Sequence, residues 1–480
     1  MKKRHLTGVK RYQCNPDTLI VVFTCFWMIV SGCALPPAAP ELPEDLPVRW
    51  SSTVGVQDLP ITSSLLDLLD DHRAIRLVAE AQANNPNLKA TALRLKAAGH
   101  LLSGQRSRAM PAIHAEVSKS RDNQSFEAET GEMTTADSHR LTIGIGWELD
   151  IWGRLANEHA AAHYDLKSQE QAYMIARDSL AARVVQAWIE LTAARLSVEL
   201  ESEQLSVLRT IEEVNLQRYA SGIGSLDEFS VAKTGTAIAT ANLSVRKATY
   251  FQVARQLELL LGRYPTGEMS ADNGLPKIEP PPVSLPAVAL MNRPDVQMSF
   301  QRIMSARHQS HAADKAVLPD LRLSGQVFKE NARLSGVGGS TANWSLFGAL
   351  LQPLFEGKRL LNTSKARRVE AEASLMDLYE TILSALKEVE DALGYEHELA
   401  IQEGSLARAV GESIKSSDYH LQRYLQGLDT IRNLLISKEQ EISVKLRLND
   451  IQAERLRNRI ALALALGVGV DKFPDAGEGE

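Results

Sequence analysis

Histidine side chains are the first candidates for chemistry, because imidazole is the commonest metal ligand and proton carrier in proteins. Two pairs have helical spacing, His159 with His163 and His308 with His311. The other histidines that we considered are His72, His100, His114, His139, His397 and His420. A zinc site needs three or four ligands at defined spacing, and no third ligand accompanies either pair. We therefore expect no metal site. Because the sequence also lacks a phosphate-binding glycine loop, we expect no enzyme and an energy supply from a partner protein.

Cys33 is the thiol best placed for a modification reaction. Basic residues at the N-terminus precede an apolar run over residues 19–30, which is short for a bilayer span and typical of an export signal. The run ends at Val30-Ser31-Gly32-Cys33, which resembles a bacterial lipobox. The sulfur would then carry a diacylglyceryl group and the new N-terminus an N-acyl chain. The alternative is a free cysteine at the end of an ordinary signal or membrane anchor.

The residues around Cys33 indicate where the protein is sorted and leave no cysteine pair for a disulfide. Cys14 and Cys25 lie in the segment expected to be removed, so the mature chain would form no internal disulfide. Ala34, in place of an aspartate, favours sorting to the outer membrane by resemblance to other bacterial lipoproteins. The proline-rich stretch that follows, residues 34–47, should run as an extended tether.

Composition indicates a folded protein without a basic field. The 480 residues are 44% hydrophobic and 23% charged, and 53 basic residues face 59 acidic ones, for a net charge of −6. Nucleic acid is therefore not an expected partner. We expect a signal peptide over residues 1–32, a lipidated tether over 33–60, a first repeat over 61–264, a linker over 265–286, a second repeat over 287–469 and a tail over 470–480.

The chain carries an internal duplication. Asn85-Pro86 aligns with Arg293-Pro294 at an offset of 208, and Arg218-Tyr219 aligns with Arg423-Tyr424 at an offset of 205. Each half reads as helix, two strands, and two long helices joined by a tight turn. The expected strands are 112–119, 140–149, 321–328 and 343–351, and the expected long helices are 155–220, 226–262, 358–425 and 429–466.

The second strand of the first half is amphipathic. Leu141, Ile143, Ile145, Trp147 and Leu149 share one face, and Thr142, Gly144, Gly146 and Glu148 share the other. The apolar face would be the core of a soluble sandwich or the lipid-facing side of an outer-membrane barrel, with Trp147 and Trp344 at the membrane interface. The strands alone leave both alternatives open.

Helix length favours a protein that spans a compartment. No proline interrupts residues 112–264 or 354–473, and a helix over 155–220 would be on the order of 100 Å long at 1.5 Å per residue. Heptad spacing indicates coiled-coil packing. Its members are Leu180, Val184, Ala187, Leu191, Ala194, Val198 and Leu205 in the first half, and Tyr379, Leu386, Leu393, Ala400, Ala407, Ile414 and Leu421 in the second. A soluble coiled coil would show the same heptads.

The combined features resemble the TolC-like outer-membrane efflux proteins, particularly NodT-type lipoproteins of resistance-nodulation-division pumps. The shared motifs are Leu259-Leu260-Leu261-Gly262-Arg263-Tyr264-Pro265, Asn292-Arg293-Pro294-Asp295, and the Arg-Tyr-x-x-Gly segments that end at Gly222 and Gly427. The resemblance implies a mainly α homotrimer with a twelve-stranded outer-membrane β-barrel and a long periplasmic coiled-coil tunnel. It also implies a periplasmic adaptor and an inner-membrane pump as partners, passive conduction of small molecules, and loops at 121–139 and 329–343 outside the cell.

The helix turns at Gly222 and Gly427 are the expected adaptor-docking tips, and the second is the expected aperture. By resemblance, Asp429 would form a carboxylate ring held closed by Arg423 or Tyr424, with Asp418 a weaker candidate; a solvated helix-start carboxylate is the alternative. Where relatives often carry Leu-Leu-Asp, this chain has Leu434-Leu435-Ile436, so a second ring would be absent.

A lipid-anchored periplasmic adaptor or coiled-coil scaffold is the alternative from another functional class. An adaptor would show one helical hairpin between lipoyl-like and barrel modules. The two hairpins of this chain, each preceded by a strand pair, favour the channel.

Overall fold

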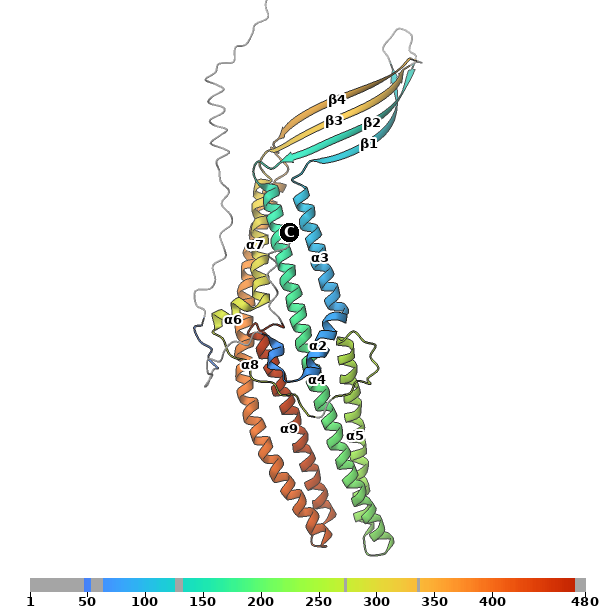
Figure 1. Ribbon diagram of the computed structural model, residues 1–480, viewed down its shortest axis with the longest axis vertical. Helices are drawn as coiled ribbons and strands as arrows, with labels where there is room; N and C mark the ends of the chain where they lie inside the picture. The colour runs from blue at the N-terminus through green and yellow to red at the C-terminus, as the bar shows by residue number, and fades with distance from the viewer. Residues whose placement is uncertain (1–46, 53–63, 126–132, 272–273, 335–336, 471–480) are drawn as a thin grey trace, which may run out of the picture. The chain divides into compact units, whose positions relative to one another are not determined.

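The computed structural model describes residues 47–52, 64–125, 133–271, 274–334 and 337–470 (Figure 1). The expected signal peptide, most of the tether and Cys33 lie outside these ranges. The chain divides into two compact units. The first includes residues 101–164 and 304–372, and the second includes residues 165–303 and 373–470 together with the described residues between 47 and 100.

The first unit contains one antiparallel sheet of four strands in the order β1-β2-β3-β4. The strands are β1 (Ala112–Ser125), β2 (Met133–Leu149), β3 (Asp320–Leu334) and β4 (Val337–Leu351). The duplication is visible in the topology, since each repeat supplies one hairpin and the hairpins meet through β2 and β3.

The predicted loops at 121–139 and 329–343 are wrong for most of their length. The β1–β2 register continues from Ala112↔Gly146 to Ser125↔Met133, and β3 pairs with β4 up to Leu334↔Val337. The apolar alternation that marks the strands in the sequence ends near Lys119. Backbone hydrogen bonds hold a ladder whatever the side chains are, so the polar ends of the strands pair as well.

The apolar face of β2 is the uncovered one. Ile143 is 56% exposed and Ile145 43%, whereas Thr142, on the opposite face, is 7% exposed. On that covered face the ring of His114 lies over Gly144, where a Cβ atom would come within 2.5 Å of it. Within the described chain, the apolar side chains therefore do not form the core of a sandwich.

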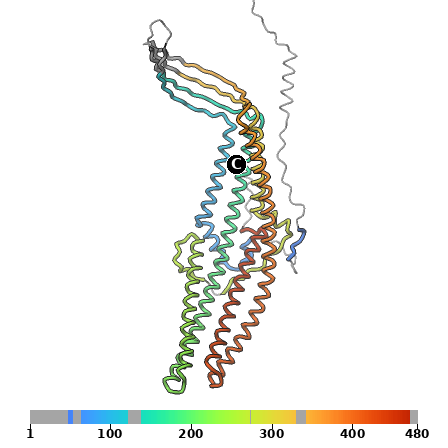
Figure 2. Tube along the Cα trace, turned by 180° about the vertical axis from the view of Figure 1, so that it is seen from behind, coloured from blue at the N-terminus to red at the C-terminus, as the bar shows by residue number. Residues whose placement is uncertain are grey.

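Long helical hairpins dominate the second unit. They are α4 (Arg154–Ala220) with α5 (Leu226–Leu260) and α8 (Arg359–Leu425) with α9 (Ile431–Ala465), and each pair lies side by side in Figures 1 and 2. All eight bounds fall within two residues of the expected ones. The shorter elements are η1 (Leu65–Leu68), α2 (His72–Asn84), α3 (Pro86–Ser107), α6 (Pro286–Asn292) and α7 (Pro294–Lys315).

The aligned Asn-Pro and Arg-Pro dipeptides perform the same task in the two repeats. Asn85 donates from Nδ2 to the carbonyl of Leu260 at 2.9 Å, at the end of α5. Arg293 donates from Nη1 to the carbonyl of Ala465 at 3.0 Å, at the end of α9. Each side chain thus satisfies a terminal helix carbonyl that has no partner within its own helix. This equivalence confirms the predicted duplication.

Helix packing follows the heptads in the first repeat and departs from them in the second. Val184 and Leu191 are fully buried as expected. In α8 the buried seam passes through Leu378, Ile382 and Val389, so the predicted stripe starting at Tyr379 is one residue out of phase. The offset is constant over three heptads, since Leu378, Ala385 and Ala392 are buried one residue before the predicted positions. Among the helices of the described residues, none has the length and apolar character of a membrane span.

Candidate functional site: the two hairpin tips

Each hairpin turns at a glycine in the left-handed conformation. We define the first tip as residues 218–229, between α4 and α5, and the second tip as residues 418–433, between α8 and α9. Gly222 has φ of +71° and Gly427 has φ of +73°. The amide of Ile223 donates to Arg218 O at 3.0 Å, and that of Leu428 donates to Arg423 O at 2.9 Å. Both turns are the glycine-terminated helix ends that the sequence predicts.

The first tip is closed by its own side chains. Ser225 accepts from the amide of Glu228 at 3.1 Å, and Glu228 accepts from the amide of Ser225 at 3.3 Å, which makes a capping box at the start of α5. The ring of Tyr219 stacks on Phe229 with centroids 6.1 Å apart, and Tyr219 remains 43% exposed.

In the second tip, Asp429 joins the end of α8 to the start of α9. Its carboxylate accepts from His420 Nδ1 at 2.6 Å, from Asn433 Nδ2 at 2.8 Å and from the amide of Thr430 at 2.8 Å. These bonds, that of His420 first, lower the pKa of Asp429 to about 2. The carboxylate is therefore ionised at neutral pH and links the two helices of its own hairpin.

Within the described chain, Arg423 and Tyr424 do not bond to Asp429, and their role in holding the aperture closed stays a prediction. Arg423 donates to the carbonyl of Leu428 at 3.0 Å, with its guanidinium 5.5 Å from the ring of Tyr419. Tyr424 points to the other hairpin. Asp418 is exposed. Arg423 and Tyr424 both lie in the last turn of α8, and each bonds to a group other than the Asp429 carboxylate.

Tyr424 connects the two hairpins. Its hydroxyl donates to Asn215 Oδ1 on α4 at 2.8 Å, and Asn215 donates in turn to the carbonyl of Ile211 at 2.8 Å. Tyr424 is 4% exposed and Asn215 2%. An apolar cluster, which we name the tip cluster, surrounds the bond. It comprises Leu205, Leu208, Ile211, Ala232, Ala239, Leu243, Tyr424, Ile431 and Leu434.

The sequence interpretation considered His420 only as a metal ligand and missed Asn215, although one signal linked them. They occupy the same place in the two repeats, at an offset of 205 and four residues before Tyr424 and Tyr219. A polar residue repeated at one position of the two long helices could have been tested for a partner. Where relatives often carry an aspartate, this chain has Ile436, which is 60% exposed, whereas Leu434 of the same segment is buried.

A family model described as outer membrane efflux protein matches residues 77–263 and 285–468, which are the two repeats. The chain belongs to the outer membrane efflux protein family. The predicted TolC-like membership is thereby confirmed, and the adaptor or scaffold alternative is wrong. The efflux protein is the outer-membrane channel component of a tripartite pump of a Gram-negative bacterium, as predicted.

Individual relatives agree with this assignment. Outer membrane protein OprJ of Pseudomonas aeruginosa is 26% identical over 421 residues, 84% of this chain and 86% of OprJ. Cation efflux system protein CusC of Escherichia coli is 22% identical and covers 91% of this chain and 96% of its own. The CmeC outer membrane channel of Campylobacter jejuni superposes with a TM-score of 0.82 at 19% identity, over 92% of this chain and 96% of its own. The match supports the predicted mainly α fold with a small sheet.

Further along α9 from the second tip, the efflux protein has a partly buried cluster of ion pairs. Glu441 accepts from Lys438 at 2.9 Å and from Lys445 at 2.5 Å. Partial burial alone would raise the pKa of Glu441, but the hydrogen bonds outweigh it and lower the pKa to about 2. Two lysines thus share one carboxylate, and the three side chains together keep one net positive charge.

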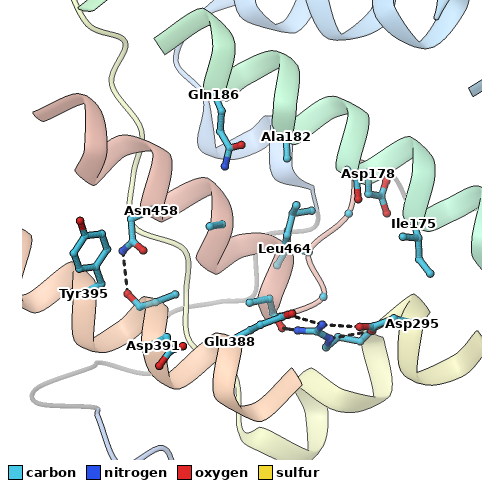
Figure 3. A pocket seen from close by; sticks show the side chains of 18 of the residues that line it. Ile175, Asp178, Ala182, Gln186, Asp295, Glu388, Asp391, Tyr395, Asn458 and Leu464 are labelled. Carbon is cyan, nitrogen blue, oxygen red and sulfur yellow. Dashed lines mark hydrogen bonds and ion pairs between the residues drawn. The ribbon is translucent and has the colours of Figure 1, made fainter. Parts of the chain in front are cut away.

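A cavity of about 1050 Å³ lies in the second unit, between α4, α8, α9 and the start of α7 (Figure 3). Acidic side chains line it, and several of them bond to other groups of the chain. Arg293 Nη2 donates to Asp295 at 2.6 Å and to Glu388 at 2.7 Å, and Asp178 accepts from the amide of Val470 at 3.2 Å. Arg293 is thus shared by two of the carboxylates that line the cavity.

The histidine pairs of the sequence do not gather ligands in the described structure. Nδ1 of His308 lies 3.0 Å from Asn157 Oδ1, and the ring stacks on Tyr164 at 5.4 Å. Burial first, and then the nearby His311 and Lys315, lower the pKa of His308. No cluster of three or more histidine, cysteine or acidic side chains suited to a metal occurs among the described residues.

Proposed function

We propose that three copies of the efflux protein close a transmembrane β-barrel and a helical tunnel, through which small molecules pass without chemical change. One observation carries the proposal. In the described structure β1 pairs with β2 and β4 with β3, and neither outer strand has a second partner. Side chains on these edges, such as Val117 and Trp344, are 82% and 77% exposed.

An open sheet cannot stay in lipid, because unpaired backbone groups there cost several kcal/mol each. Joining β4 of one copy to β1 of the next removes both edges, and three copies give the twelve strands of a closed barrel. The test is the mass of the purified protein by sedimentation in detergent. A trimer is expected, and a monomer would end the proposal.

We also propose that the second tip forms the closed aperture and that the tip cluster holds it shut. Opening by movement of α8 and α9 would separate Tyr424 from Asn215 and uncover the apolar side chains around them. Asp429 keeps a place in this scheme as the residue that fixes the shape of the moving hairpin. Conductance in planar bilayers tests the scheme, since variants that loosen the cluster should open more often than the parent.

The partners and the lipid complete the proposal. Exposed apolar side chains at the turns, Ile223 at 76% and Leu428 at 60%, suit docking of a periplasmic adaptor at Gly222 and Gly427. An inner-membrane pump of the resistance-nodulation-division type would supply energy, and the channel itself would catalyse no reaction. Cys33 would carry the diacylglyceryl and N-acyl lipid; palmitate labelling should disappear in Cys33→Ala, and persistent labelling would contradict this assignment.

A further inference from the structure

A short N-terminal segment, Pro47–Ser52, packs on the second repeat. We name it the clip. Its Trp50 is 6% exposed and belongs to an apolar cluster with members from α6, α8 and α9. These members, which we name the socket, are Ala289, Val389, Ala392, Leu393, Leu462, Ala465 and Leu466. A buried indole holds a large apolar area out of water, so this contact anchors the segment.

Two sets of hydrogen bonds hold the clip, one from the indole of Trp50 and one from the backbone amides of the next two residues. Trp50 Nε1 donates to the carbonyl of Ser284 at 2.7 Å. The amides of Ser51 and Ser52 donate to the two carboxylate oxygens of Glu390, at 2.7 Å and 2.9 Å. One carboxylate thus holds two successive backbone amides, and hydrogen bonds to an ionised acceptor are stronger than neutral ones.

The charge state of Glu390 agrees with this role. Partial burial would raise its pKa, but the hydrogen bonds from Ser51 and Ser52 outweigh burial and lower the pKa. The carboxylate is therefore an acceptor for both amides at neutral pH.

The first repeat has no such carboxylate. At the offset of 205, the position of Glu390 corresponds to Val185, which is fully buried in the core. The duplication therefore supplied the helices, whereas the acceptor for the clip is specific to the second repeat. If both repeats needed this carboxylate for their own packing, the first repeat would carry an acid where it has Val185.

We propose that the clip fastens the N-terminal arm to the socket and so pins the middle of α8 to the C-terminal end of α9, remote from the second tip. The inference rests on the proposed function in one respect, because the arm leads to Cys33, the expected lipid site. Seventeen residue steps separate Cys33 from Trp50, and they can span at most about 60 Å. The socket, and not the first helix, would then be the point from which the arm reaches the membrane.

Hydrogen exchange followed by mass spectrometry tests the clip in the full-length protein in detergent. In the parent, the peptide containing Ser51 and Ser52 should exchange at least tenfold more slowly than in Trp50→Ala. Glu390→Gln should give an intermediate rate, because the amide side chain keeps one acceptor oxygen of two. Trp344→Ala, which removes an exposed indole of the sheet, is the matched control and should exchange like the parent.

Two results would overturn the proposal. Full exchange in the parent at the rate of an unstructured peptide would show that the socket does not hold the segment. Loss of protection in Cys33→Ala would show that the lipid, and not the socket, holds it. Sedimentation of the same samples keeps the proposals separate, because a trimer with an unprotected clip refutes the clip alone.

Discussion

The two hairpin tips carry the same Arg-Tyr-x-x-Gly segment and use its tyrosine in opposite ways. Tyr219 stacks on Phe229 within its own hairpin and stays 43% exposed. Tyr424 crosses to the other hairpin, is 4% exposed, and donates to Asn215. The turns match because a left-handed glycine is a local requirement. The tyrosines differ because the first hairpin offers Tyr424 a buried acceptor, Asn215, whereas the equivalent residue of the second hairpin, His420, is bonded to Asp429.

The second tip is therefore the one whose tyrosine is buried, and the first hairpin supplies the acceptor for it. The two repeats therefore contribute unequally to the proposed aperture, although the duplication made them equal in outline. Variants made in matched pairs, one in each tip, can break or sharpen this comparison.

The largest effect is expected for Tyr424→Ala. Removing a buried aromatic ring from a packed cluster costs about 3–5 kcal/mol, and here that loss falls on the packing between the hairpins. Open probability in planar bilayers should rise strongly. Tyr219→Ala is the matched variant, and its half-exposed ring should give a much smaller change. Equal conductance of the two variants would remove the distinction between the tips.

A smaller effect is expected for Asn215→Ala, which leaves the hydroxyl of Tyr424 buried without an acceptor. An unsatisfied buried group costs about 1–3 kcal/mol. Combining Asn215→Ala with Tyr424→Phe should recover part of that loss, because the stranded hydroxyl is then absent. A double-mutant cycle on bilayer conductance measures the coupling, and strictly additive effects would show that the bond does not join the hairpins.

The turn glycines should be equivalent. Alanine at a left-handed position costs about 1–2 kcal/mol, and no atom lies within 4 Å of a Cβ added at Gly222 or Gly427. Gly222→Ala and Gly427→Ala should therefore accelerate amide exchange in their own turns to a similar extent. A large excess at either glycine would reveal a constraint beyond backbone conformation.

Local rules account for what could be predicted from the sequence. The bounds of the long helices follow from proline-free runs and from turn glycines, which need no knowledge of the rest of the chain. The strands were underestimated because their polar ends pair through backbone groups alone. The hydrogen bond between Tyr424 and Asn215 joins residues 209 positions apart, and no periodicity encodes such a pair. The contact of His420 with Asp429 depends on how the turn closes, which the spacing of nine residues leaves undetermined.

The smallest expected effect is a pH response that belongs to the second tip. The pKa of Asp429 is lowered from 3.8 to about 2. A depressed carboxylate stabilises the folded hairpin above its ordinary pKa, and this contribution is lost as the pH falls through the folded value. Between pH 7 and 5 the carboxylate therefore stays ionised, and protection of the Thr430 amide, which donates to it, should be lost only below about pH 4.

Asp429→Asn should remove this acid transition from the exchange profile of the tip. His420→Gln removes the side chain that donates to the Asp429 carboxylate from α8. If protection of Thr430 in the parent falls between pH 7 and 5 and this fall disappears in His420→Gln, the imidazole and not the carboxylate controls the turn. If instead the loss occurs below about pH 4 in the parent and moves to higher pH in His420→Gln, the bond from His420 holds the Asp429 carboxylate ionised and joined to α8.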